Sequence, residues 1–243
     1  SKIKSIKNNP IIIATHAAIY HQNLFNHNIG LLVIDEQHKF GVEQRLNLAK
    51  KGNGVHTLIM TATPIPRTLQ LAQYGDLDIS TINQIPEGRK GTKTRIVESK
   101  NYENYLRFVK TRIELGEQAF IVVPAIEESE TIDLKNVNEV LLDYKQYFPM
   151  YNIQALHGKL SAQEKNSILE DFAKAKIHIL ISTSVIEVGI NILNATIMSI
   201  YNPERFGLSS LHQLRGRVGR GHLPGFFFLL TLESASHEAI KRL

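Results

Sequence analysis

Short runs of apolar residues constrain the fold of this chain more than any other feature. Gly30–Ile34 contains only apolar residues, and the strands expected at 119–126, 177–181 and 225–230 are nearly as apolar. A strand with one solvent-exposed face would alternate apolar and polar residues, so these continuous runs fit parallel strands that are covered on both faces. Apolar residues recur at helical spacing between the runs, for example at 102–115. Strands alternating with helices predict an α/β chain with parallel sheets.

The composition changes between residues 84 and 93. Few apolar residues occur there, and six turn-forming or basic residues crowd together: Pro86, Gly88, Arg89, Lys90, Gly91 and Lys93. Such a stretch is typical of a linker between domains. We therefore expect a first lobe at 1–87, a linker at 88–93 and a second lobe at 94–243.

The composition also bears on the cellular location of the protein. No apolar run approaches the ~20 residues that span a bilayer, and no signal-peptide pattern opens the sequence. The chain has no cysteine, which excludes disulfides and thiolate metal sites. We expect a cytoplasmic protein with no membrane partner.

Basic residues gather in two segments that are expected to be loops. The formal net charge is +5 and the pI is about 9.3, which favours a polyanionic partner. The excess of Arg and Lys lies at 89–95 and 205–220. Loops often carry the residues that bind ligands. The position of the basic residues thus supports a polyanionic partner more strongly than the net charge does.

Residues 213–221 interleave three arginines with three glycines after a glutamine. Glycine lets the backbone approach a ligand closely, and the arginine fork matches two phosphate oxygens at once. A basic glycine-rich loop in solvent has the same composition, so this segment alone leaves both interpretations open.

The order Gln213-x-x-Gly216-Arg217-x-Gly219-Arg220 resembles the sixth motif of superfamily 2 helicases, which carries the arginine fingers. The adjoining runs 202–208 and 211–213 narrow the resemblance to the RecG family of branch-migration helicases. The resemblance implies two RecA-like lobes, of which the first is incomplete and contributes only its C-terminal half. It also implies that ATP binds between the lobes, with Gln213 on the nucleotide and with Arg217 and Arg220 as catalytic fingers.

Two carboxylates follow the first apolar run, Asp35 and Glu36. Ligands of α/β sheets bind at the carboxyl ends of the strands. Asp35 is placed to hold Mg²⁺ through water, and Glu36 to orient and deprotonate the attacking water. An acidic pair can also simply end a strand. The run 35–45 resembles the RecG Walker B region and favours the catalytic interpretation, with His38 as a coupling residue.

Hydroxyl-bearing segments follow several of the expected strands. Residues 61–64 resemble motif III, which implies that Thr61 and Thr63 couple the nucleotide site to DNA. The resemblance further assigns Thr15 and Arg67 to DNA phosphates, although Ala14 stands where the family has glycine. Without the resemblance, Thr15 is a plain helix cap at the end of a strand expected at 11–14.

Residues 182–195 resemble motif V. Hydroxyls at a junction between a strand and a helix suit phosphate binding. The resemblance assigns Thr183 and Ser184 to DNA and Gly189 to the nucleotide. Asn191 replaces an aspartate that the family presents near the ribose, and an amide can still accept one hydrogen bond there.

The sequence contains no Gly-x-x-x-x-Gly-Lys-[Ser/Thr] run. We therefore expect a fragment of a larger motor that lacks its Walker A loop and its wedge domain and that is inactive alone. The resemblance implies an ATP- and Mg²⁺-dependent DNA helicase. Its partner would be branched DNA, namely forks and Holliday junctions met in repair and recombination. We expect a monomer, although the sequence itself gives no oligomeric state.

Two other functions fit parts of the sequence. A transcription-repair coupling translocase usually has glutamate at the position of Gln37, and residues 187–188 and 203–205 also argue against it. A non-catalytic nucleic-acid-binding module would explain Asn191 and the missing Walker A run. The intact acidic pair and both arginines oppose that alternative.

Overall fold

The computed structural model describes residues 11–15, 29–35, 56–61, 78–82, 84, 90–124, 130–183, 195–219 and 221–232. The chain divides into two compact units, Ser1–Leu77 and Asp78–Leu243, here called unit 1 and unit 2. The lobe boundaries expected at 87 and 94 stay predictions. Strand β3 (Thr92–Glu98) already begins inside the expected linker.

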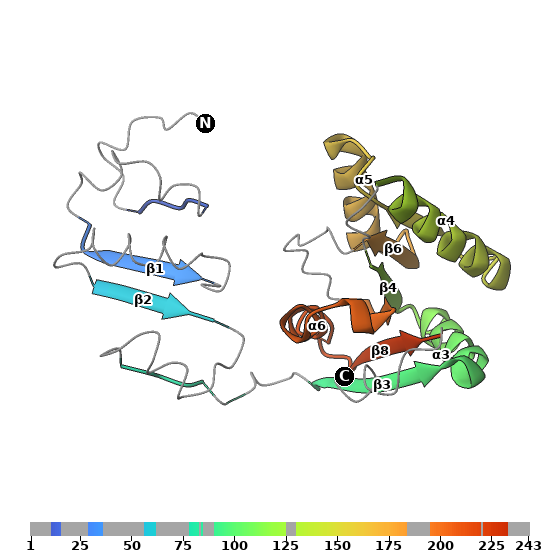
Figure 1. The fold of residues 1–243 in the computed structure, drawn as a ribbon, viewed down its shortest axis with the longest axis horizontal. Helices are drawn as coiled ribbons and strands as arrows, with labels where there is room; N and C mark the ends of the chain where they lie inside the picture. Colours follow the sequence, from blue (N-terminus) through green and yellow to red (C-terminus); the bar gives the residue numbers. More distant parts are fainter. Residues whose placement is uncertain are drawn as a thin grey trace. The chain divides into compact units, whose positions relative to one another are not determined.

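The described part of unit 1 contains two strands, β1 (Leu31–Asp35) and β2 (His56–Met60). They are parallel, with Leu31 opposite His56 and Asp35 opposite Met60 (Figure 1). The strand expected at 11–14 is not formed. These residues form neither helix nor strand and are exposed, Ile13 to 94%, and no described strand offers them the backbone partners that a ladder requires.

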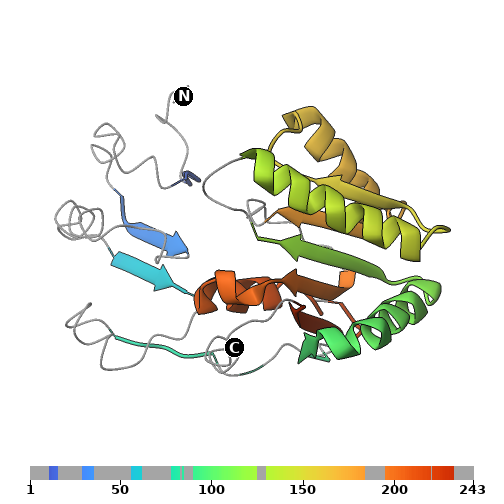
Figure 2. The same cartoon turned by 45° about the vertical axis from the view of Figure 1, so that its right-hand side comes forward.

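Unit 2 is built on one six-stranded sheet. Its strands in chain order are β3, β4 (Gln118–Val123), β5 (Ile153–Leu156), β6 (Ile179–Thr183), β7 (Ala195–Tyr201) and β8 (Gly225–Thr231). They lie side by side in the order β3-β8-β7-β4-β6-β5, and every neighbouring pair is parallel. Strand β3 thus lies at one edge beside β8, although the two come from opposite ends of the unit's sequence (Figure 2). The parallel α/β class is confirmed.

Four described helices accompany this sheet: α3 (Tyr102–Glu114), α4 (Glu130–Tyr147), α5 (Ala162–Ala173) and α6 (Leu208–Arg215). Two short 3-10 helices, η4 (Ser99–Asn101) and η5 (Pro203–Arg205), join strands to helices. The pattern Ser161-x-x-Glu164 forms a capping box at the start of α5. The Glu164 N–H donates to Ser161 Oγ at 3.3 Å, and the Ser161 N–H donates to Glu164 Oε2 at 2.8 Å. None of the described helices combines the length and apolar character needed to cross a membrane.

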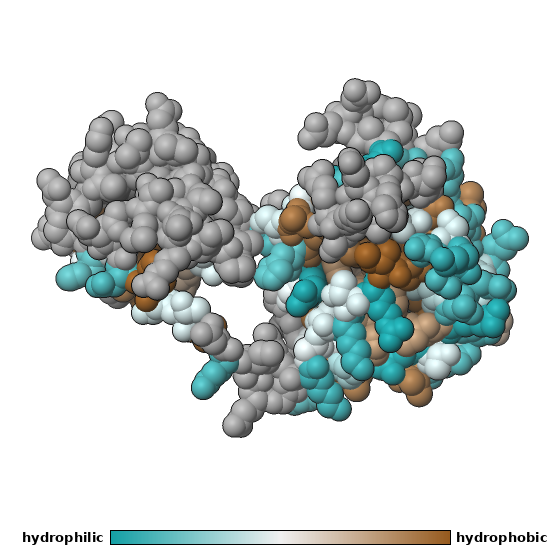
Figure 3. All heavy atoms as spheres, turned by 60° about the horizontal axis from the view of Figure 1, so that its bottom comes forward, coloured by the Kyte–Doolittle hydropathy of each residue, from teal (hydrophilic) through white to brown (hydrophobic). Residues whose placement is uncertain are grey.

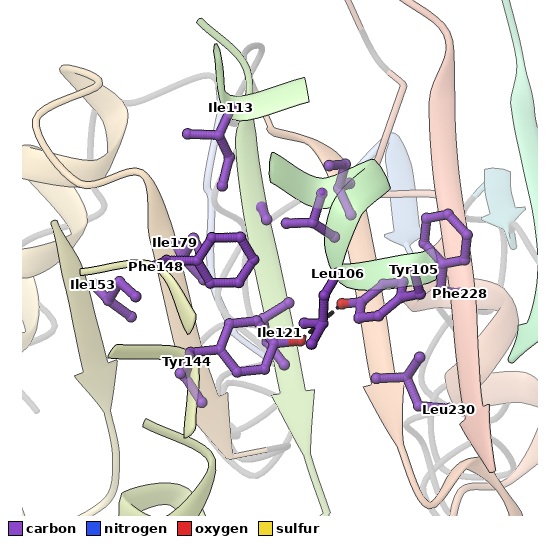
Figure 4. Close-up of a cluster of buried hydrophobic side chains, with 14 of the residues drawn as sticks. Tyr105, Leu106, Ile113, Ile121, Tyr144, Phe148, Ile153, Ile179, Phe228 and Leu230 are labelled. Carbon is purple, nitrogen blue, oxygen red and sulfur yellow. Dashed lines mark hydrogen bonds between the residues drawn. The ribbon is translucent and has the colours of Figure 1, made fainter. Parts of the chain in front are cut away.

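The core of unit 2 lies on both faces of the sheet. Along β8, Phe228 and Leu230 join the cluster under α3 and α4 (Figure 4). Phe227 and Leu229 join the cluster under α6. The aromatic run 226–228 therefore belongs to the core and is not a platform for bases. On the face shown in Figure 3, hydrophilic side chains cover much of the described surface of unit 2, with smaller hydrophobic areas between them.

Buried tyrosine hydroxyls connect the helices to the sheet. The hydroxyls of Tyr105 and Tyr144 lie 2.8 Å apart (Figure 4), and Tyr105 donates to Ser199 at 2.7 Å. A second pair, Tyr102 and Tyr201, lies at 2.6 Å. Burial is the main reason why the pKa values of Tyr105, Tyr144 and Tyr201 are raised above the ordinary value. The network keeps these hydroxyls neutral and satisfied inside an apolar core.

Candidate nucleotide and nucleic-acid site

In unit 1, two of the predicted site residues lie at the same edge of the sheet. Asp35 is the last residue of β1, and Thr61 directly follows β2. Asp35 pairs with Met60 in the register, and neighbouring strands are about 4.8 Å apart. Thr61 is therefore one residue beyond the partner of Asp35, and both are exposed. An exposed carboxylate and a hydroxyl-bearing residue come together at the carboxyl end of parallel strands, where such sheets bind ligands.

The chemistry of Asp35 fits the Mg²⁺ site that the resemblance implies. Within the described ranges, no three His, Asp or Glu side chains converge as a complete metal cage. Mg²⁺ bound with a nucleotide does not need one, because it keeps several waters and uses one or two carboxylates together with phosphate oxygens. A single exposed carboxylate at a strand end suits that arrangement.

In unit 2, the segment carrying Arg217 continues from the last turn of α6. The N–H of Gly216 donates to the carbonyl of His212, and the N–H of Arg217 to the carbonyl of Leu214, both at 3.0 Å. The next residue, Val218, is only 3% exposed and belongs to the hydrophobic cluster under α6. The backbone on both sides of Arg217 is thus fixed, and the arginine itself is half-buried. We call residues 216–219 the arginine loop.

The arginine loop closes at Gly219, where only glycine fits. Its φ angle is +71°, and a Cβ there would lie 2.9 Å from Gly225 N and 3.0 Å from Gly91 O. Both the left-handed backbone and the close approach exclude a side chain. The loop therefore ends in direct backbone contact with the start of β8.

The segment 202–206 leads from β7 into α6. Asn202 has a left-handed backbone (φ 45°, ψ 58°), and its N–H donates to Leu230 O at 3.2 Å. Pro203 is buried, and Phe206 packs against the same hydrophobic cluster as Val218. The run that carried the family resemblance thus forms the corner that positions α6 and, through it, the arginine loop.

Two hydroxyl residues end strand β6. Ser182 is fully buried and donates to Thr183 O at 2.8 Å, and Thr183 is 4% exposed. Thr183 therefore lies at a carboxyl strand end, as expected, but with little surface of its own. Its contact with DNA stays a prediction.

The other predicted residues are only partly described. Gln213 lies in the last turn of α6 and is half-buried, and Thr15 is exposed at the end of the segment 11–15. The helix that Thr15 was expected to cap lies outside the described residues. So do eight further predicted site residues: Glu36, His38, Thr63, Arg67, Ser184, Gly189, Asn191 and Arg220.

Sequence reasoning gave no role to two residues with notable surroundings. His157 follows β5, and burial together with the nearby charges of Lys159 and Lys165 lowers its pKa. Thr92, in the expected linker, donates its hydroxyl to Val218 O at 3.1 Å. The basic residues around His157 are visible in the sequence, whereas nothing local marks Thr92.

The comparisons with known proteins agree with this geometry. Residues 1–72 match the DEAD/DEAH box helicase model, and residues 100–222, just over half of the chain, match the helicase conserved C-terminal domain. The chain therefore belongs to the helicases that carry these two domains.

Two similar relatives indicate the family more specifically than the two domain models do. The ATP-dependent DNA helicase RecG of Thermotoga maritima is 47% identical over 247 residues, covering 100% of this chain and 31% of that protein. RecG of Synechocystis is 47% identical, with 96% of this chain and 28% of that protein covered. The chain thus spans less than a third of the length of these relatives, and the RecG resemblance is confirmed.

Solved structures show the same fold. A structure of RecG bound to a three-way DNA junction is 42% identical, with a TM-score of 0.64 over 88% of this chain and 27% of that one. Dbp5 of S. cerevisiae bound to RNA and ADP BeF3 is 17% identical, with a TM-score of 0.59 over 89% of this chain and 56% of that one. The second likeness concerns the fold alone. The RecA-like arrangement expected from the sequence is confirmed.

Proposed function

We propose that these 243 residues form part of the motor core of an ATP-dependent DNA helicase of the RecG type. The observation that carries the proposal is the arginine loop. Its backbone is fixed on one side by α6 and on the other by buried Val218 and Gly219, which suits a side chain that must be held in place for catalysis. A solvated basic loop would not need a buried anchor or a backbone contact at van der Waals distance.

Groups from both units would act on one ATP. In unit 1, Asp35 would hold Mg²⁺, which offsets the charge of the phosphates, and Glu36 would orient the attacking water. In unit 2, Arg217 and Arg220 would stabilise the charge that develops on the transferred phosphoryl group. Gln213, Gly189 and Asn191 would contact the nucleotide, and Thr61, Thr63 and His38 would couple its state to DNA.

A second set of residues indicates the nucleic-acid partner. Thr15, Arg67, Thr183 and Ser184 would address DNA phosphates, which position a protein without reading sequence. Branched DNA is the proposed substrate, in the remodelling of forks and Holliday junctions during repair and recombination in the cytoplasm. The 243-residue chain alone should therefore bind DNA weakly and without preference for a fork.

A salt series tests the partner. Affinity of the chain for a fork and for a linear duplex should fall together as salt rises, because phosphate contacts dominate. A strong preference for the fork at all salt concentrations would show that branch recognition lies within these residues.

The catalytic role is tested in the full-length protein that carries this chain. Arg217→Ala should lower DNA-stimulated ATP turnover by about 10³-fold and leave ATP affinity nearly unchanged, since finger arginines act mainly in the transition state. The matched control is Arg215→Ala, two residues away and exposed. Equal turnover of the two variants would favour the non-catalytic module instead.

A further inference from the structure

The end of the expected linker is joined directly to the arginine loop. Thr92 Oγ1 donates to the carbonyl of Val218 at 3.1 Å, across 126 positions of sequence. One residue earlier, Gly91 O accepts a hydrogen bond from Gly225 N–H at 2.9 Å. The residues at the start of β3 and directly before it therefore contact both the arginine loop and the first residue of β8.

These contacts leave no room for side chains. A Cβ on Gly219 would lie 3.0 Å from Gly91 O, and a Cβ on Gly225 would lie 2.9 Å from both Thr92 Oγ1 and Gly219 Cα. Gly91 itself has a φ of +72°. We call Gly91, Thr92, Val218, Gly219 and Gly225 the glycine junction. Its parts touch backbone to backbone, so a shift of one part must be taken up by the others.

The pairing of the edge strand strengthens the junction. Strand β3 pairs with β8 along its whole length, from Thr92 opposite Gly225 to Glu98 opposite Thr231. Because β3 is the edge strand, β8 is its one neighbour in this sheet. The Thr92 hydroxyl adds a contact outside this ladder. Its hydrogen bond to the Val218 carbonyl connects β3 to the arginine loop through a side chain.

We propose that Thr92 is a positioning residue for the arginine loop. Its hydroxyl fixes the carbonyl of Val218, the residue directly after Arg217, and so holds the arginine backbone relative to the linker end. This inference rests on the proposed function of Arg217. Displacing a catalytic group by about 1 Å can cost on the order of 10²-fold in rate. A small displacement of the arginine loop should therefore lower the measured rate of ATP turnover.

Two substitutions separate the hydroxyl from the rest of the side chain. In the full-length protein, Thr92→Val keeps the volume and removes the donor, and it should lower kcat for DNA-stimulated ATP hydrolysis by about 10- to 100-fold. The KM for ATP should change less than about threefold, since ground-state binding is retained. Thr92→Ser keeps the donor and should restore most of kcat. The matched control is Thr94→Val, the same change two residues along β3 at an exposed position.

A second readout does not depend on catalysis. Hydrogen exchange in the 243-residue chain should show the amides of residues 216–219 exchanging about fivefold faster in Thr92→Val than in Thr94→Val, the effect of losing one hydrogen bond. Thr92→Ser should match the unchanged chain.

The outcomes distinguish the two proposals. If Arg217→Ala abolishes turnover while Thr92→Val and Thr94→Val behave alike in kcat, the positioning role is wrong and the proposed function stands. If Thr92→Ser is as slow as Thr92→Val, the hydroxyl is not responsible and the inference fails. If Arg217→Ala leaves turnover intact, the proposed function fails and the positioning role fails with it.

Discussion

Strands β1 and β6 have similar sequences but lie in different surroundings. Each begins with three aliphatic residues and ends in a polar residue, Asp35 in β1 and Thr183 in β6. In β6 the residues Ile179, Leu180 and Ile181 are 0% exposed, whereas in β1 Leu31 is 60% and Val33 49% exposed. Strand β6 lies between β4 and β5, while β1 has only β2 as a described neighbour. In β1 and β6 similar apolar runs both form strands, and the neighbouring strands decide how far each run is buried.

The two units also differ in how they present the proposed catalytic groups. Unit 1 offers an exposed carboxylate at the end of a short parallel pair. Unit 2 offers an arginine held by a helix end, a buried valine and a glycine contact. A carboxylate that binds Mg²⁺ through water tolerates some freedom, but an arginine that acts on a transition state needs a fixed position.

The largest expected effect separates the chain from the complete motor. The chain alone should release phosphate from Mg²⁺-ATP more than a thousandfold more slowly than the full-length protein, with or without branched DNA. It has no run of the Walker A type, and positioning of reactants supplies on the order of 7–11 kcal/mol of catalysis, of which even half is worth more than a thousandfold.

Contaminating ATPase is the main risk in that assay, and Glu36→Gln of the same chain controls for it. DNA-stimulated turnover that disappears in Glu36→Gln would contradict the prediction, because the phosphates would then be held by other residues of the chain.

The next effect tests the rigidity of unit 2. Gly219→Ala should lower the free energy of unfolding by about 2–4 kcal/mol, combining backbone strain with overpacking. Gly158→Ala is the matched control, since Gly158 has no positive φ and no atom within 4 Å of its Cβ position. Urea unfolding measures both variants. Equal midpoints would show that the glycine junction is not close-packed.

The smallest effect concerns the buried tyrosines of unit 2. Their pKa values are raised by burial above the unfolded value of about 10, so the folded state favours the neutral hydroxyl. The stability that this provides is complete below about pH 10 and is lost as the pH rises further. The urea midpoint should be flat from pH 8 to 9.5 and fall above pH 10.

Tyr105→Phe removes one of the titrating groups and should reduce that fall by about 1 kcal/mol at pH 11. Tyr147→Phe is the control, because it removes the hydroxyl of a side chain that is 36% exposed and leaves the buried tyrosines in place. The same slope in Tyr105→Phe would assign the alkaline loss to other groups.

Local patterns predicted most of the elements correctly. The apolar runs at 30–34, 177–181 and 225–230 predict β1, β6 and β8 to within two residues, and the Ser161-x-x-Glu164 pattern indicates the capping box of α5. Strand β4 ends at Val123, earlier than expected, because Pro124 cannot donate to a ladder. Helix α4 begins at Glu130, although the acidic run 127–130 on its own predicts a solvated loop. These errors concern ends of elements, where local preference is weakest.

The errors of greater consequence concern long-range contacts. Ile11, Ile12 and Ile13 look like a buried strand, yet pairing partners are supplied by distant parts of a chain and not by the segment itself. Thr92 looked like part of a flexible linker, and its role depends on Val218, 126 positions away. The motif predicts a catalytic role for Arg217, which stays a prediction, and it gives no sign of the contacts that hold the backbone around this residue.

One measurement tests most directly whether the two units act on a single ATP. Asp35→Asn and Arg217→Lys are combined in the full-length protein, and single-turnover ATP hydrolysis is measured for both singles and the double. Groups that serve the same chemical step are strongly non-additive. We expect the double variant to be slower than the slower single by less than about tenfold. A double whose loss equals the product of the two single losses would show that the carboxylate and the arginine act independently and would contradict the account.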